Sequence, residues 1–178
     1  PFFTSNTSLV FNWGGTSDQV QNISNTLRSR SHNELVVNKL HYYIDYLYKG
    51  RYNYQDAYGL VPFYVELDAN KPQLYESLIK VKFVTESEFI LDIPFEGRNA
   101  ELIKYSDNSK SQISVVAGEF KKRYRVGQRV NLPFMNFVLE IKDNPGLYKG
   151  NEYYIRFRDF DETVARYQGI KVDIDQKA

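Results

Sequence analysis

The chain has 178 residues and a formal net charge of +1, so it can bury one good core but has too little charge to recruit nucleic acid or an anionic membrane. Cysteine is absent, which excludes disulfide bonds, zinc ribbons and thiol catalysis. No apolar run approaches the roughly 18 residues needed to span a bilayer. The chain begins abruptly at Pro1-Phe2-Phe3 and stops in the charged stretch Asp173 to Lys177. We therefore expect a soluble piece of a longer protein.

A short strand and two consecutive helices are predicted at the N-terminus. Residues Thr7 to Asn12 place Leu9 and Phe11 on one face, as in a strand. Apolar residues then recur at helical spacing, and this period breaks between Ser29 and Ser31 before it restarts. The residues that carry it are Val20, Ile23 and Leu27 before the break, and Val36, Leu40, Tyr43, Ile44 and Leu47 after it. The pattern predicts two helices over Ser17 to Tyr48.

Ser31 and Glu34 have the spacing of a capping box, in which the serine hydroxyl accepts from a first-turn amide and the glutamate reaches back to the serine amide. We therefore expect Ser31 to be the N-cap of the second helix. The tyrosine-rich segment Ile44 to Tyr54, with turn chemistry at Gly50 and Asn53, is compatible with the last turn of that helix or with a short strand.

From Ser77 onward, helical spacing gives way to short alternating runs, which are typical of an antiparallel sheet with one solvated face. A strand at Val61 to Asp68 precedes this region. The further candidate strands are Leu78 to Val84, Glu88 to Ile93, Glu101 to Tyr105, Gln112 to Val116, Lys121 to Val126, Phe134 to Ile141 and Tyr153 to Arg158. Their spacing predicts a small sandwich or barrel-like lobe. Asp159 or Asp161 then caps a helix that ends at Gly169, and Ile170 to Ile174 form the last strand.

Two parts of the sequence resemble a known family. The run NISNTLRSRSHNELVVNKL followed by YYIDYLYKG is similar to a segment of the Wzz/Wzc-type polysaccharide co-polymerases, the chain length determinants, and especially to those fused to cytoplasmic bacterial tyrosine kinases. The succession of elements near the C-terminus is also similar. It comprises Phe137 to Ile141, the turn Pro145-Gly146, Tyr153 to Phe157, the helix Asp161 to Gln168, and Ile170 to Ile174. The middle, from about Leu74 to Val130, resembles the family less and is interpreted as an insertion.

We predict an α+β fold, in which a mixed sheet with the N-terminal helix pair (residues 1–73 and 131–178) carries an inserted, mainly antiparallel β lobe (residues 74–130). The resemblance implies the periplasmic portion of an inner-membrane protein that regulates the chain length and export of capsular or exopolysaccharide through ring-like oligomers. The implied partners are further copies of the chain, a polysaccharide polymerase or outer-membrane export channel, and, as an open option, the polysaccharide. It also implies that the Leu9 to Phe11 and Ile170 to Ile174 strands share one sheet near the membrane.

Two groups of residues are candidate binding surfaces. The outward side chains of the helix pair would form the contact between subunits, and they are Arg28, Arg30, Glu34, Asn38 and Lys39. The second group is the basic cluster Lys121, Lys122, Arg123, Tyr124 and Arg125, whose interleaved aromatics could stack on a sugar or a base. The alternative for this cluster is a charged sheet edge that discourages association between sheets.

Nothing in the sequence predicts a catalytic, cofactor or metal site. His32 and His41 would lie about 180° apart on one helix, so they cannot share a metal. Paired carboxylates occur beside strand ends or helix caps, and no nucleophile elbow, phosphate loop or dinucleotide motif is present. No kinase residue lies in the chain, so we expect it to be inert by itself. The alternative function is an extracellular carbohydrate-binding β-sandwich, which would need a concave face of exposed aromatics. A hydrolase would need two carboxylates that converge in a pocket.

Overall fold

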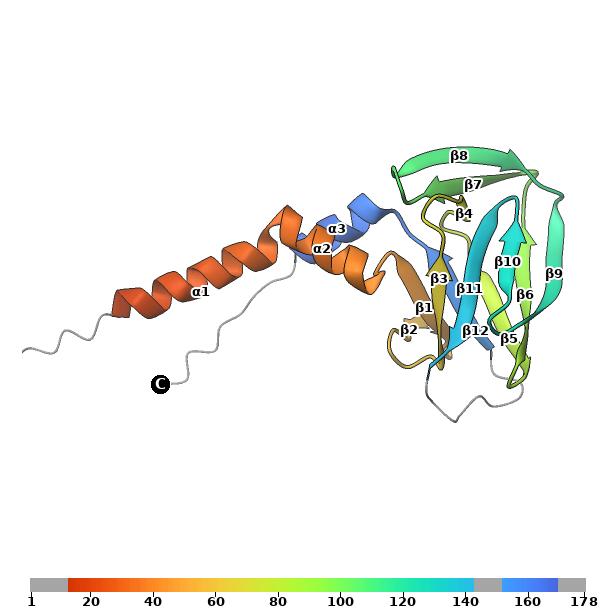
Figure 1. Cartoon of the computed structure of the whole chain (residues 1–178), viewed down its shortest axis with the longest axis horizontal. Coiled ribbons are helices and arrows are strands. Elements are labelled where there is room, and N and C mark those ends of the chain that lie inside the picture. Colours follow the sequence, from red (N-terminus) through yellow and green to blue (C-terminus); the bar gives the residue numbers. More distant parts are fainter. Residues whose placement is uncertain (1–12, 143–151, 170–178) are drawn as a thin grey trace, which may run out of the picture.

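The structure is a computed structural model, and it describes residues 13–142 and 152–169 (Figure 1). The strands gather in one β-rich body, α1 extends away from this body as an arm, and α2 and α3 lie between the two. The elements are α1 (Trp13–Arg28), α2 (Arg30–Leu40), β1 (Ile44–Lys49), β2 (Tyr54–Asp56), β3 (Phe63–Leu67), β4 (Gln73–Leu74), β5 (Ile79–Thr85), β6 (Glu88–Phe95), β7 (Asn99–Lys104), β8 (Ser109–Ser114), β9 (Gly118–Arg125), β10 (Arg129–Leu132), β11 (Met135–Ile141), β12 (Glu152–Phe157) and α3 (Phe160–Gln168).

The strands form three antiparallel sheets, with the orders β2-β1-β12-β5-β6-β9, β10-β11-β3 and β4-β7-β8. The predicted α+β class with a mixed sheet is therefore wrong, because the fold is β-rich and each sheet is antiparallel. Short turns join β5 to β6, β7 to β8 and β10 to β11, and such turns can only connect antiparallel neighbours. The helices extend from one side of the body, with α1 farthest out, instead of forming a layer on a sheet.

Strands from both predicted parts of the chain share the six-stranded sheet. β12, from the C-terminal part, lies between β1 and β5, with Tyr46 opposite Ile155 and Val81 opposite Tyr153. One continuous apolar cluster runs through the body. Its largest fully buried side chains include Phe63, Phe83, Phe89, Phe137 and Phe157. Each such ring stabilises the fold by roughly 1.5–3 kcal/mol relative to an exposed one, so the alternating apolar runs set which face of each strand points inward.

The helix break is present but its cap differs from the prediction. Ser29, not Ser31, is the N-cap of α2, with extended backbone angles and a side chain that accepts from the amide of His32 at 3.3 Å. The buried Asn33 amide also donates to the carbonyl oxygens of Leu27 and Ser29, at 2.7 and 2.9 Å. The Leu27 carbonyl is one of those left without an intrahelical partner where α1 ends, whereas the Ser29 carbonyl also accepts from the Asn33 backbone amide at 3.2 Å. The Ser29 and Asn33 side chains thus hold the junction between the helices.

The second of the two helices predicted over Ser17 to Tyr48 ends earlier than expected. α2 stops at Leu40, where His41 adopts the left-handed conformation with φ 51°. The aromatic residues that follow enter β1, and Ile44 and Tyr46 are buried against the body. Sheet pairing with β12 outweighs the helical spacing of this segment, because β-branched and aromatic side chains pack well on a half-buried pleated surface.

The predicted Leu9 to Phe11 and Ile170 to Ile174 strands lie outside the described residues, and so does the expectation that they share a sheet. In the described part of the chain, none of the helices has the length and apolar character that a membrane crossing requires.

Candidate functional site

The arm formed by α1 projects away from the β-rich body (Figure 1). Every side chain from Asp18 to Arg28 is exposed except the half-buried Ser24. Val20, Ile23 and Leu27 are among the exposed large apolar residues, and the Ile23 side chain is 59% exposed. Their spacing of three and four residues places them on one stripe of the helix. No charged residue occurs between Asp18 and Arg28.

The predicted subunit-contact residues divide into two groups. Arg30 and Glu34 are engaged within the chain, because Arg30 donates to Glu34 at 2.6 Å and to Asp161 of α3 at 2.5 Å. These hydrogen bonds raise the pKa of the Arg30 guanidinium, and the bond to Glu34 contributes most. Arg28, Asn38 and Lys39 are exposed. Only the Arg30–Asp161 pair joins α2 to α3, since Arg30 and Glu34 both lie on α2. Arg28, Asn38 and Lys39 are therefore the group more available to an outside partner.

The predicted basic cluster lies on β9, the edge strand of the six-stranded sheet. Lys121 pairs with Glu119 at 2.5 Å and with Asp92 at 3.7 Å, and Arg123 lies 3.8 Å from Glu88. The register puts Lys121 and Arg123 opposite Asp92 and Ile90, on the face away from the core. Lys122 and Arg125 are also exposed. The cluster is thus divided between two faces and is partly neutralised by acidic neighbours.

Tyr124 cannot serve as a stacking platform for a ligand. Its side chain is 4% exposed, and its ring stacks on Phe89 with a centroid distance of 5.9 Å. Burial raises the pKa of its hydroxyl. The Lys122 ammonium lies 5.4 Å from the same ring centroid, so this aromatic ring belongs to the core and to an internal cation contact.

A polar groove occurs on the outer face of the β10-β11-β3 sheet, and the sequence did not predict it. Two overlapping hollows of about 450 and 530 Å³ share Lys71, Asn131 and Asn136. We call them together the polar groove, and its polar lining is Glu66, Asp68, Lys71, Arg129, Asn131 and Asn136. The available signal was Asn136 inside an apolar strand run, because asparagine is disfavoured in strands.

Asn136 is the fixed centre of the polar groove. It is 5% exposed, and its backbone exchanges two hydrogen bonds with the fully buried Gln73 amide, at 2.7 and 3.0 Å. Its side-chain oxygen accepts from Arg129 at 3.0 Å, and its nitrogen donates to Asn131 at 2.9 Å. The amide is therefore held in one orientation from both ends.

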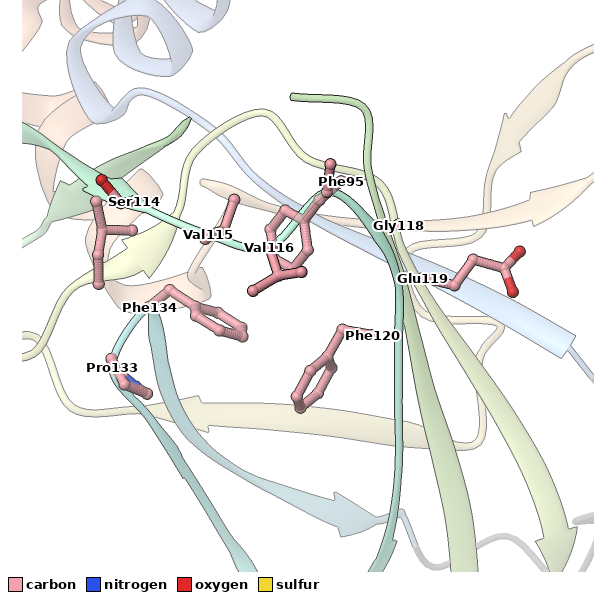
Figure 2. A pocket seen from close by; sticks show the side chains of 11 residues that line it. Phe95, Ser114, Val115, Val116, Gly118, Glu119, Phe120, Pro133 and Phe134 are labelled. Atoms are coloured by element: carbon pink, nitrogen blue, oxygen red, sulfur yellow. The ribbon is translucent and has the colours of Figure 1, made fainter. Parts of the chain in front are cut away.

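An apolar pocket of about 340 Å³ adjoins the polar groove at Pro133, which lines both (Figure 2). The rings of Phe120 and Phe134 lie beside each other, with centroids 5.5 Å apart. The Phe95 ring meets the Phe134 ring edge to face, with centroids 5.4 Å apart. Val116 stands over these rings and is exposed, whereas Glu119 points away from them. The pocket thus offers aromatic and aliphatic surface with little polar character.

Exposed tyrosines do not gather on a single face of the β1-β2 hairpin. In the strand register, Tyr48 lies opposite Gln55 and Lys49 lies opposite Tyr54. Opposed residues share a face and successive residues alternate between faces, so the side chains of Tyr48 and Tyr54 point to opposite faces. Among the carboxylates noted in the sequence, Asp159 caps α3 and pairs with Lys110 at 2.8 Å, and Asp161 pairs with Arg30 at 2.5 Å. Across residues 13–142 and 152–169, no group of three or more His, Cys, Asp or Glu side chains is placed to hold a metal ion.

No protein-family model matches this chain, and no curated protein matches it significantly. The resemblance to the polysaccharide co-polymerases therefore depends on the sequence segments alone.

Proposed function

We propose that this chain is the periplasmic part of a polysaccharide co-polymerase, which regulates the chain length or export of a capsular or extracellular polysaccharide by assembling with further copies of itself. The sequence resemblance supports the family. The observation that carries the mechanism is α1, an arm with an exposed apolar stripe and nine consecutive uncharged residues, Gln19 to Leu27. The chain would act by holding neighbouring subunits in a fixed arrangement, not by catalysing a reaction.

The composition of α1 favours a protein partner over solvent. A helix that faces water normally carries charges on its exposed side, whereas the cores of subunit interfaces are depleted in charge. An isolated helix of this length is marginally stable in water, so it gains stability from being covered. Val20, Ile23 and Leu27 supply the apolar area for such a contact.

The proposed partner of α1 is a second copy of the chain. Ring assembly uses heterologous contacts, in which one surface meets a different surface of the next subunit. α1 reaches beyond the body (Figure 1), which suits an element that contacts a neighbour. Arg28 and Lys39 lie on the exposed side of the helix pair and would meet acidic or polar groups of that neighbour.

The test uses the full-length membrane protein, because anchoring gives the high effective concentration that lateral contacts require. Ile23→Asp and Arg28→Glu should each weaken the assembly, measured as complex size in detergent extracts, and shift the polysaccharide length distribution in parallel. Leu60→Asp, at an exposed apolar residue outside α1, is the matched control for Ile23→Asp and should change neither. If polysaccharide length changes while the assembly is intact, or if neither responds, α1 is not the assembly surface.

A further inference from the structure

We infer that the polar groove is a binding site for a neutral saccharide chain, with the adjoining apolar pocket receiving an apolar part of the same ligand. The choice of a saccharide over other hydroxyl-rich ligands rests on the proposed function. The geometry of the groove is independent of α1, so the two proposals can fail separately.

Side chains of both charges line the groove, with Arg129 and Glu66 on opposite sides of it. Arg129 and Glu66 both lie opposite Val138, on the two sides of β11. Two strand spacings, about 10 Å, therefore separate their backbones, and the Arg129 guanidinium donates to the Asn136 side chain at 3.0 Å. Asn136, two residues from Val138 on the same face of β11, lines both hollows. This arrangement leaves a donor wall and an acceptor wall on either side of a trough that a sugar ring can enter.

The donors and acceptors of the groove match hydroxyl groups. Arg129 uses one terminal nitrogen on Asn136, which leaves further N–H donors of its guanidinium fork. Asn131 uses its oxygen to accept from Asn136, which leaves its NH₂ group as a donor. Glu66 and Asp68 add carboxylate acceptors on the opposite side. A sugar hydroxyl both donates and accepts, so adjacent hydroxyls can bridge the two walls.

The groove is preorganised and of suitable size. Asn136 is fixed by Gln73 through its backbone and by Arg129 and Asn131 through its side chain, so binding would require little reordering of the groove centre. Hollows of about 450 and 530 Å³ fall within the roughly 300–1,000 Å³ of ordinary ligand sites. The centre of the site therefore exists before a ligand arrives.

The charge balance and the apolar pocket define the ligand class further. Lys71 and Arg129 balance Glu66 and Asp68, so an acidic polymer gains no net attraction from the groove. In the apolar pocket beyond Pro133, the rings of Phe120 and Phe134 line the surface. Such rings can pack against the C–H face of a sugar or against an apolar substituent of that sugar. A neutral chain that runs from the polar groove to the apolar pocket fits both surfaces.

The test is a calorimetric and NMR titration of the soluble protein with neutral glucan, mannan and galactan oligosaccharides, a polygalacturonate oligomer, and the surface polysaccharide extracted from the producing cells. We expect saturable binding to a neutral saccharide, with shifts in the side-chain amide signals of Asn131 and Asn136. Asn131→Asp keeps the acceptor for Asn136 but removes the free donor, and Lys71→Ala removes an exposed cation; each should weaken binding by about tenfold or more.

Arg125→Ala, on the exposed edge of β9, is the matched control for loss of a cation and should bind as the unmodified protein does. Ile23→Asp should also bind normally, which separates this site from assembly through α1. Absence of saturable binding to every saccharide, tighter binding to polygalacturonate than to neutral chains, or undiminished binding by both groove variants would overturn the inference.

Discussion

Replacing Gln73 by glutamate should destabilise the protein in a pH-dependent way. The Gln73 side chain is fully buried, donates to the carbonyl of Asn136 at 2.7 Å and accepts from its amide at 3.0 Å. It thereby joins β4 to β11, which belong to different sheets. A protonated glutamate can reproduce this donor and acceptor pair. An ionised glutamate cannot, because it places a buried negative charge against the Asn136 carbonyl oxygen.

The sign of the effect follows from proton binding in the two states. Burial and the facing carbonyl raise the pKa of the new carboxyl in the folded state above its unfolded value of about 4.3. The folded state then binds more protons than the unfolded state between these two pKa values, so stability falls as pH rises through that window. We expect Gln73→Glu to lose about 1 kcal/mol near pH 4 and about 3 kcal/mol at pH 7.5, from one weakened bond and one unpaired buried charge.

Urea unfolding of Gln73→Glu and of the unmodified protein, near pH 4 and at pH 7.5, measures the loss of stability directly. Gln73→Met leaves the Asn136 amide and carbonyl unpaired at every pH, so its loss of about 2 kcal/mol should not depend on pH. Gln19→Glu, on the exposed face of α1, controls for the added charge and should change stability little at either pH. Equal destabilisation by Gln73→Glu at both pH values would show that the Gln73 side chain does not hold β4 to β11 as described.

Three further predictions concern the cap, the core and the buried tyrosines. Ser29→Ala should lower the free energy of unfolding by about 1 kcal/mol, whereas Ser31→Ala should change it by much less; the reverse order in urea unfolding would contradict the observed cap. Phe83→Ala should cost about 3–5 kcal/mol, and thermal unfolding with little loss would mean that its site is not a packed core. Burial raises the pKa of both Tyr43 and Tyr46 to about 12, so the folded state keeps protons that the unfolded state releases near pH 10, and stability should decline as pH rises from about 10 towards 12. Ultraviolet titration should show these two tyrosines ionising after the exposed ones, and early ionisation of every tyrosine would refute their burial.

Local sequence patterns predicted the elements better than their arrangement. The alternation of Phe89, Leu91 and Ile93 correctly located β6 and the face that it buries. A strand's alternation of apolar residues can be read from a short stretch of sequence. The same reasoning extended the second helix too far, because Tyr43, Ile44 and Leu47 satisfy a helical spacing as well as a buried strand. The decisive partner of that segment is β12, more than a hundred residues away, and periodicity carries no information about such a pairing.

The candidate sites show the same limit. A run of basic residues on β9 was visible in the sequence, but Asp92 and Glu88, which partner Lys121 and Arg123, come from the neighbouring strand β6. This part of their neutralisation was therefore not visible. The polar groove brings together residues from β3, β10, β11 and the turn at Lys71. No window of the sequence contains that set, and only the sheet register places Arg129 and Glu66 on the two sides of Val138.

The position of β12 also governs how this chain can fold during synthesis. Until Glu152 and the residues after it have left the ribosome, β1 and β5 each lack the neighbour that separates and joins them in the finished sheet. Unpaired strand edges of this kind readily recruit other chains, and pairing between distant segments is slow. The nascent protein must therefore stay open, or shielded by a chaperone, until β12 emerges, and a chain shortened before Glu152 should aggregate instead of forming a smaller stable body.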